Sequence, residues 1–290
     1  MINIERTGFL IFLNKIEKLY HKIVKFFKIC NMSKVNAIGL FDSGIGGTSI
    51  WKAINQLLPK ENTIYLADSK NAPYGLRTKS EIITLCCKNV DFLLSQNCKI
   101  IVVACNTATT NAIKELRAKY TVPIIGIEPA IKTAANKTQT QIIGILATKG
   151  TLNSELFNRQ VESFINAKII EQVGYGLVEL IENGQINSQE MTQLLTSYLT
   201  PMINADIDYL VLGCSHYPYL IPIIEKIIPK KIKIIDSGEA VAKQTKAILE
   251  NNNLLNTSNQ KSTQIFYTNG NLSILKNILS FEENVFKREF

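Results

Sequence analysis

Apolar, β-branched runs recur along the chain from residue 36 onward, and each is followed by a longer stretch with helical spacing. The strand-like runs read NAIGLFD, NTIYLAD, CKIIVVA, VPIIGI, QIIGILA, AKIIEQV, DYLVLGC, KIKIID and TQIFYT. The helical stretches include residues 48–58 and 79–96, and the second of these opens on Thr78-Lys79-Ser80-Glu81, which is typical of a capping box. Strands that are apolar on both faces predict parallel sheets with helices on each side. Nine such strands fit two smaller sheets better than one large sheet.

Two segments of the chain repeat the same layout. KIIVVACNTATTNAI and DYLVLGCSHYPYLI each contain an apolar strand, a cysteine, two hydrogen-bonding residues and a helix-like run. FDSGIGG near the start and IDSGEAVA near the end also share an Asp-Ser-Gly. We therefore expect an α/β protein with two pseudo-symmetric parallel-sheet domains.

The composition is that of a globular protein, with 46% hydrophobic and 19% charged residues among 290. No apolar run reaches the roughly 20 residues that a membrane-spanning helix needs. The six cysteines have irregular spacing, which favours reduced thiols in the cytoplasm over a disulfide framework. With only two histidines and no ligand cluster, the sequence predicts no metal site.

The net charge of +8 is concentrated in residues 1–31, which hold six Lys/Arg and two Glu and so carry half of it. This stretch could be a basic amphipathic helix that touches a membrane surface or a partner. Alternatively, translation begins at Met32, just before the first strand. We expect residues 1–31 to lie outside the fold. The remaining charge is too small to require a nucleic-acid partner.

Ligands of open parallel sheets bind beyond the carboxyl ends of the strands. That rule places several polar segments of this chain at one rim. They are Asp42-Ser43, Pro73-Tyr74-Gly75, Cys105-Asn106-Thr107, Glu128 and Cys214-Ser215-His216.

Cys105 and Cys214 are the candidate reactive groups of this rim. Each ends a strand and precedes a helix-like run, where the positive end of the helix dipole favours thiolate over thiol. His216 follows Cys214 by two residues. A single cysteine at a strand end is usually a small buried hydrophobe, but two in the same polar setting indicate chemistry. The other four cysteines lack this setting.

Two loops could hold an anion. The glycines of DSGIGG would let a small carboxylate approach the backbone at a helix N-terminus, with Asp42 facing a cation or a thiol. A tight turn capped by Asp42 is the alternative. In NAPYG, Pro73 and Gly75 flank Tyr74, which would fix the ring and leave backbone N–H groups for a ligand. An ordinary turn is the alternative.

Taken together, these segments resemble the glutamate racemases of the aspartate/glutamate racemase superfamily. The matching motifs are DSGIGG, APYGLR, ACNTATT, GIEPAIK, LATKGT, GCSHYPYL, DSGEAVA and FYTNG, in the order of the family, over residues 36–270. The resemblance implies a cofactor-independent enzyme that interconverts L- and D-glutamate for peptidoglycan synthesis, with two α/β domains, a cleft between them and a homodimer. We expect the first domain to comprise residues 36–130 and 237–290, and the second residues 131–236.

The resemblance also implies a role for each matching residue. Cys105 and Cys214 would be acid/base thiols on opposite faces of the substrate. Asp42 would assist Cys105, while Glu182 and His216 would assist Cys214. The substrate-binding positions would be Asp42, Ser43, Pro73, Tyr74, Gly75, Asn106, Thr107, Ser215 and His216. The segment before Glu182 departs from the family pattern, because it lacks the Cys-Pro pair found there.

Two thiols suit racemisation because the α-hydrogen leaves one face of the carbon and a proton arrives at the other. A cysteine titrates close enough to neutrality for one thiol and one thiolate to coexist. Other hypotheses are an aspartate or other amino-acid racemase of the same superfamily, a non-catalytic regulatory binding protein and a pyridoxal-phosphate racemase.

Overall fold

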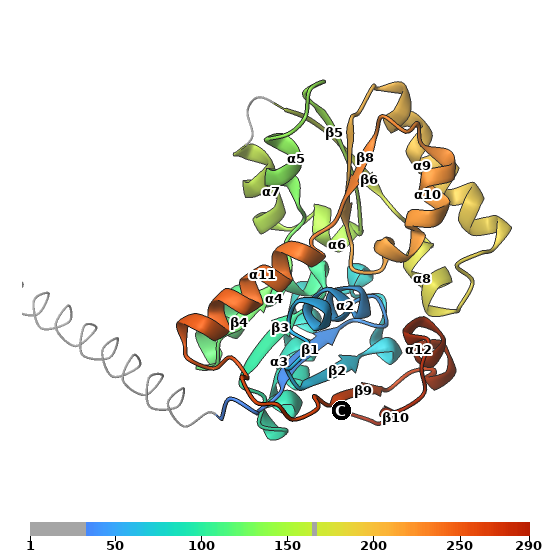
Figure 1. Cartoon of the computed structure of the whole chain (residues 1–290). Coiled ribbons are helices and arrows are strands. Elements are labelled where there is room, and N and C mark those ends of the chain that lie inside the picture. The colour runs from blue at the N-terminus through green and yellow to red at the C-terminus, as the bar shows by residue number, and fades with distance from the viewer. Residues whose placement is uncertain (1–32, 164–166) are drawn as a thin grey trace, which may run out of the picture.

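The computed structural model describes residues 33–163 and 167–290 (Figure 1). Its strands form two parallel sheets. The six-stranded sheet contains β1 (Ile38–Asp42), β2 (Thr63–Ala67), β3 (Ile100–Val103), β4 (Ile124–Gly126), β9 (Gln264–Thr268) and β10 (Val285–Lys287). The four-stranded sheet contains β5 (Ile142–Ala147), β6 (Lys168–Val173), β7 (Tyr209–Gly213) and β8 (Lys233–Ile235).

The two sheets share one strand order. The larger sheet is ordered β10-β9-β2-β1-β3-β4 and the smaller β6-β5-β7-β8, so the last four strands of each follow the same scheme. All neighbouring pairs are parallel. The expected fold class is confirmed, and the repeated sequence layout corresponds to the third strand of this shared order in both sheets, β3 and β7.

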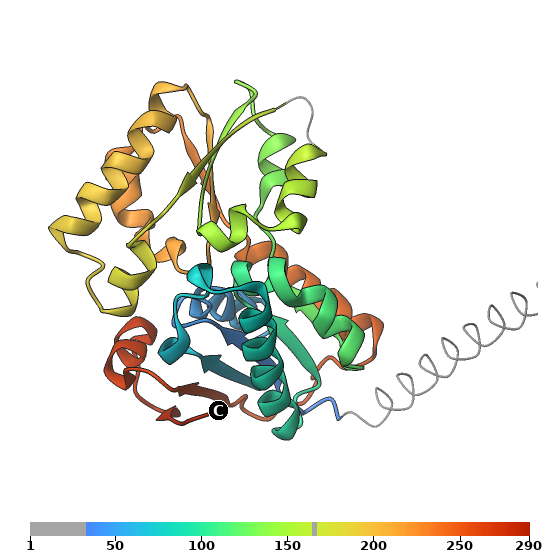
Figure 2. The same cartoon turned by 180° about the vertical axis from the view of Figure 1, so that it is seen from behind.

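The helices lie on both faces of each sheet (Figures 1 and 2). Those that belong to the larger sheet are α2 (Thr48–Leu57), α3 (Lys79–Ser95), α4 (Asn106–Lys119), α11 (Gly238–Asn251) and α12 (Leu272–Leu279). Those of the smaller sheet are α5 (Ile131–Ala135), α6 (Lys149–Leu152), α7 (Glu155–Glu162), α8 (Leu177–Glu182), α9 (Gln189–Asn204) and α10 (Ile221–Ile227). Three short 3₁₀ turns are η1 (Ser69–Asn71), η2 (Tyr74–Leu76) and η3 (Tyr217–Leu220).

Alternate residues of the larger sheet face different helix layers, as the period of a strand requires. Leu40 and its strand partner Val102 pack in the cluster that includes residues of α2 and α11. Phe41 and Val103 pack in the cluster of α3 and α4. Both faces are therefore buried, which is why these strands read as continuous apolar runs.

The core on the α2 and α11 side continues into the smaller sheet, where Leu210 and Leu212 belong to the same cluster with α8, α9 and α10. The other face of the smaller sheet packs separately against α5 and α7. One apolar core thus joins the two sheets, so their carboxyl ends are held beside each other.

Several sequence expectations can be compared with the structure. The capping box is present, because Thr78 accepts from the Glu81 N–H and the Glu81 side chain accepts from the Thr78 N–H. The nine expected strands all form, and β10 is an additional short strand. The expectations for residues 1–31 lie outside the described residues, and the domain boundaries stay a prediction. Within residues 33–163 and 167–290, no helix has the length and apolarity to cross a membrane.

Candidate active site

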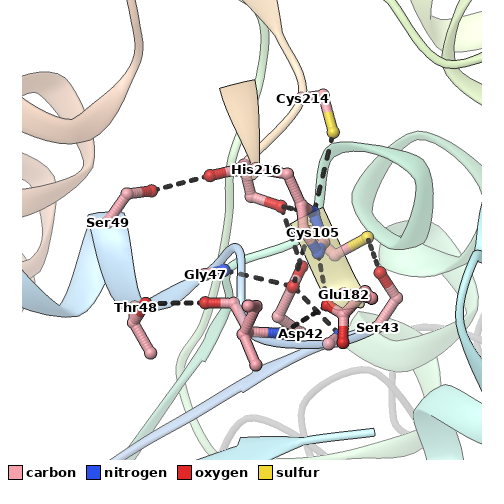
Figure 3. Close-up of polar contacts among 12 residues, drawn as sticks. Asp42, Ser43, Gly47, Thr48, Ser49, Cys105, Glu182, Cys214 and His216 are labelled. Carbon is pink, nitrogen blue, oxygen red and sulfur yellow. Dashed lines mark hydrogen bonds and ion pairs between the residues drawn. The ribbon is translucent and has the colours of Figure 1, made fainter. Parts of the chain in front are cut away.

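The carboxyl ends of β1 and β3 in the larger sheet meet that of β7 in the smaller one. Asp42 ends β1, Cys105 follows β3, and Cys214 follows β7. A hydrogen bond spans the junction, because the Ser215 hydroxyl donates to Asp42 Oδ1 at 3.0 Å. The Ser49 hydroxyl, at the start of α2, also donates to the Ser215 carbonyl at 2.9 Å (Figure 3).

A cavity lies at this junction, and both candidate thiols border it. The lining residues are Ser43, Pro73, Tyr74, Gly75, Cys105, Asn106, Thr107, Thr148, Val178, Cys214, Ser215 and His216. Ten of these twelve were named from the sequence. Asp42 and Glu182 lie behind this lining, where they contact residues that form it.

Cys105 is the N-cap of α4, and its sulfur accepts from the Ala108 N–H at 3.4 Å. The Ser43 hydroxyl lies 3.6 Å from the same sulfur (Figure 3). Burial raises the pKa of the Cys105 thiol well above its usual value, and the charge of Asp42 raises it further. The contacts with Ala108 and Ser43 only partly offset this increase. The expected lowering by the helix dipole is therefore wrong for Cys105, because desolvation disfavours the thiolate more strongly.

Cys214 has different neighbours. It precedes the 3₁₀ turn η3, which continues directly into α10. Its sulfur lies 3.8 Å from His216 Nδ1, and His216 Nε2 lies 2.6 Å from Glu182 Oε1 (Figure 3). The thiol, the imidazole and the carboxylate thus form a continuous polar chain.

His216 is buried between these partners. Burial alone would lower the pKa of the imidazole, but the hydrogen bonds to Cys214 and Glu182, with the negative charge of Asp42, raise it well above its usual value. Asp42 Oδ2 lies 4.0 Å from His216 Nδ1. The geometry therefore favours an imidazolium beside the Cys214 sulfur.

The glycine-rich loop after β1 binds carboxylates of the protein itself. Asp42 Oδ2 accepts from the N–H groups of Gly44 and Gly47, at 3.0 and 3.1 Å. Glu182 Oε1 accepts from the Ile45 N–H at 2.7 Å. The hypothesis of a cradle for a substrate carboxylate is thus wrong for these three N–H groups, whereas the expectation that Asp42 faces a cation fits its position beside His216.

Close approach explains the glycines of this loop. A Cβ on Gly46 would lie 2.2 Å from His216 Nδ1, and one on Gly44 would lie 1.8 Å from Glu182 Oε1. Any side chain at either position would displace the polar chain that ends at Cys214.

Burial raises the pKa of Asp42, although the charge of His216 and the Gly47 N–H act in the opposite direction.

Asn106 supplies polar atoms without partners. Its side-chain Oδ1 and Nδ2 are both buried, and neither makes a hydrogen bond within the described chain. A buried amide in this condition costs about 1–3 kcal/mol per unsatisfied group. Because Asn106 lines the cavity, a polar ligand there would satisfy both atoms.

Thr148 and Val178 line the cavity but were not named from the sequence. Thr148 follows β5, the strand that corresponds to β1 in the shared order, and its hydroxyl lies 2.7 Å from that of Thr107. The strand-end rule would have found it in LATKGT. Glu128, in contrast, was expected at this rim but lines a separate cavity with Arg117 and Ser237. Glu128 follows β4, the edge strand, which is separated from β1 by β3.

Among the described residues, no group of three or more His, Cys, Asp or Glu side chains is arranged to hold a metal ion. The chemistry available at the cavity is that of two thiols, an imidazole and two carboxylates. Such groups carry protons, and they lie on opposite sides of the junction between the sheets.

The sequence matches the Asp/Glu/Hydantoin racemase family over residues 38–245. The chain belongs to this family. It is an amino-acid racemase. The glutamate racemase of Ralstonia pickettii is 42% identical to it over 236 residues, which cover 81% of this racemase and 83% of the relative.

Two solved structures are similar to this racemase. Glutamate racemase from Francisella tularensis, in complex with D-glutamate, superposes with a TM-score of 0.76 at 28% identity, covering 89% of this chain and 98% of that one. Escherichia coli glutamate racemase, in complex with L-glutamate and the activator UDP-MurNAc-Ala, superposes with a TM-score of 0.75 at 31% identity, covering 85% and 96%.

Proposed function

We propose that this racemase interconverts L- and D-glutamate without a cofactor, using Cys105 and Cys214 as the two acid/base groups. The placement of both thiols on one cavity, each on a different sheet, is the observation that carries the proposal. The relatives support glutamate as the substrate, since solved members of the family bind its L- and D-forms.

Each turnover moves one proton across the substrate. The thiolate on one side takes the α-hydrogen as a proton, and the electron pair of the C–H bond remains on the α-carbon and its carboxylate. The thiol on the other side then donates its proton to the opposite face of that carbon. The two sulfurs exchange protonation states, so the enzyme must either run in reverse or exchange a proton with water.

The polar groups beside the two thiols have different roles in proton transfer. His216, held by Glu182, stabilises a thiolate at Cys214 through its charge. Asp42 and Ser43 adjoin Cys105, where the raised pKa keeps the sulfur protonated and ready to donate. General acid–base groups contribute about 10²- to 10⁴-fold, so further stabilisation of the carbanion is required.

That stabilisation comes from fixed polar groups in a site that excludes water. The proposed substrate-binding residues, Ser43, Asn106, Thr107 and Ser215, carry amide or hydroxyl groups at the cavity. The unpartnered Asn106 amide can bind both the carboxylate and the ammonium of an amino acid. Pro73, Tyr74 and Gly75 form the facing wall. Supply of D-glutamate for peptidoglycan, a homodimer and a cytoplasmic location belong to the same proposal.

Hydrogen exchange at the α-carbon tests this function. Purified wild type, Cys105→Ser and Cys214→Ser are incubated with L-glutamate and then D-glutamate in heavy water without added cofactor. We expect the wild type to racemise both with deuterium incorporation, and both variants to lose racemisation. Exchange of aspartate but not glutamate would refute the substrate, and no exchange with any amino acid would refute the catalytic role.

A further inference from the structure

The Tyr74 side chain lines the cavity, yet its hydroxyl is bonded to groups that do not. It donates to Asp68 Oδ2 at 2.5 Å and accepts from Asn89 Nδ2 at 3.2 Å. Tyr74, Asp68 and Asn89 are all buried. The hydroxyl is therefore occupied by the protein, and the loop that carries Tyr74 is fixed from behind the cavity wall.

Asp68 is in turn held by Asn269, a residue from the far end of the chain. Asn269 Nδ2 donates to Asp68 Oδ1 at 2.5 Å, and Asn269 Oδ1 accepts from the Lys70 N–H at 2.9 Å. Asn71 Nδ2 also donates to Asp68 Oδ1, at 2.8 Å. The buried Asn269 side chain thus joins the Asp68 carboxylate to the turn that leads into the Tyr74 loop.

The position of Asn269 follows from the sheet. It comes directly after β9, and Thr268 pairs in register with Ala67 of β2. The Asn269 N–H donates to the Ala67 carbonyl at 3.4 Å. Residue 269 lies beyond the residues 38–245 that match the family, although it belongs to the FYTNG segment. The last part of the chain therefore reaches the wall of the active site.

The backbone of the Pro73–Gly75 loop has N–H groups that can donate hydrogen bonds to a substrate. Within the described chain, neither the Tyr74 N–H nor the Gly75 N–H donates a hydrogen bond to another residue, and both residues line the cavity. Small displacements of such groups weaken their hydrogen bonds, because these interactions fall off steeply with distance and angle. Their placement depends on what holds the loop.

We propose that Asn269 is a positioning residue for substrate binding: through Asp68 and the Tyr74 hydroxyl, it holds the Pro73–Gly75 loop against the substrate. This inference rests on the proposed racemisation of glutamate. Its consequence is a change in KM and not in proton transfer, since within the described chain neither thiol forms a hydrogen bond with this network.

The test compares Asn269→Ala with wild type by measuring kcat and KM for L- and D-glutamate. We expect KM to rise about ten-fold, the equivalent of one lost hydrogen bond, while kcat changes less than about three-fold. Asn269→Asp should raise KM further, because it places a second carboxylate against Asp68. Tyr74→Phe should also raise KM, and the double variant Asn269→Ala/Tyr74→Phe should be no worse than either alone, because both act through one network.

Asn256→Ala is the matched control. Asn256 is also buried, and its Nδ2 donates to the Lys60 carbonyl at 2.8 Å, outside this network. We expect it to lower the melting temperature without changing KM. An unchanged KM in Asn269→Ala, a loss confined to kcat, or additive effects with Tyr74→Phe would overturn the positioning role while leaving the proposed function intact. A wild type that does not racemise glutamate would overturn both.

Discussion

The two thiols occupy corresponding positions in the two sheets but have different surroundings. Each follows the third strand of the shared order, β3 for Cys105 and β7 for Cys214. Cys105 caps a regular α-helix, and its sulfur hydrogen-bonds to an N–H and a hydroxyl. Cys214 precedes a 3₁₀ turn and contacts an imidazole backed by a carboxylate. The two sheets thus share a strand order, but the polar partners of their two cysteines differ.

This difference exists although the proposed reaction is symmetrical. Two enantiomers have equal free energy in water, so the equilibrium constant is one, and kcat/KM must be equal in both directions at every pH. Each thiol with its polar partners is called a half-site. Unequal half-sites can alter kcat, KM and the rate of proton exchange with water. They cannot alter the ratio of the kcat/KM values for the two directions. Every active variant must obey the same equality, which provides an internal check on the kinetic assays.

Replacing either thiol should have the largest effect. We expect Cys105→Ser and Cys214→Ser each to lower racemisation by about 10²- to 10⁴-fold or more. Cys105→Ser should still exchange the α-hydrogen of one enantiomer with heavy water, because the remaining Cys214 keeps its imidazolium partner. Cys214→Ser should exchange far less, since the remaining thiol is held protonated by burial. Proton NMR measures the loss of the α-hydrogen signal in each variant. Equal residual exchange in the two variants would show that the half-sites are equivalent.

Removing the nearest partner of each thiol should have unequal effects. His216→Asn removes the cation beside Cys214, and we expect kcat to fall about 10²-fold. Ser43→Ala removes one weak contact from Cys105 together with a hydroxyl proposed to bind the substrate, so KM should rise while kcat falls less than about ten-fold. Kinetic assays in both directions measure the difference, with circular dichroism as the control for folding. Similar losses in the two variants would contradict the comparison.

The pH profile of kcat/KM should separate the two half-sites. The charge of Asp42 contributes to the raised pKa of Cys105, so Asp42→Asn should move the alkaline limb to lower pH. His216→Asn should instead move the acid limb to higher pH, because a thiolate at Cys214 loses its neighbouring cation. Profiles of the wild type and both variants test this assignment, and a shift of the same limb by both would refute it.

The smallest effect is expected for a thiol outside the cavity. Cys87 lies within α3 and is half-buried. Cys87→Ser should leave kcat within about two-fold of wild type in both directions. It serves as the matched control for the two catalytic replacements, and a large loss in this variant would mean that thiol replacement disturbs the enzyme by other routes.

The parallel sheets could be predicted because buried strands must be apolar on both faces, and that requirement is visible in runs such as KIIVVA. The rim residues followed from the rule that ligands bind at the carboxyl ends of strands. The same rule misplaced Glu128, because it does not say which strand ends border one cavity and which, like that of the edge strand β4, border another. The short strand β10 was missed because three residues at a sheet edge carry too little pattern.

The electrostatics of the site could not be predicted from the sequence. The pKa of Cys105 depends on its burial, which results from the packing of residues distant in the sequence. The contact of Glu182 with the Ile45 N–H joins residues 137 positions apart. No local signal marks such a contact, although the close approach it requires explains why residue 44 is a glycine.

The order of strands in the larger sheet has a consequence for biosynthesis. β9 pairs with β2, yet it comes from the end of the chain, after all four strands of the smaller sheet. On the ribosome, the smaller sheet can therefore assemble while the larger one still lacks two strands. We expect the nascent chain to gain its complete substrate wall only when the segment around residue 269 has left the exit tunnel.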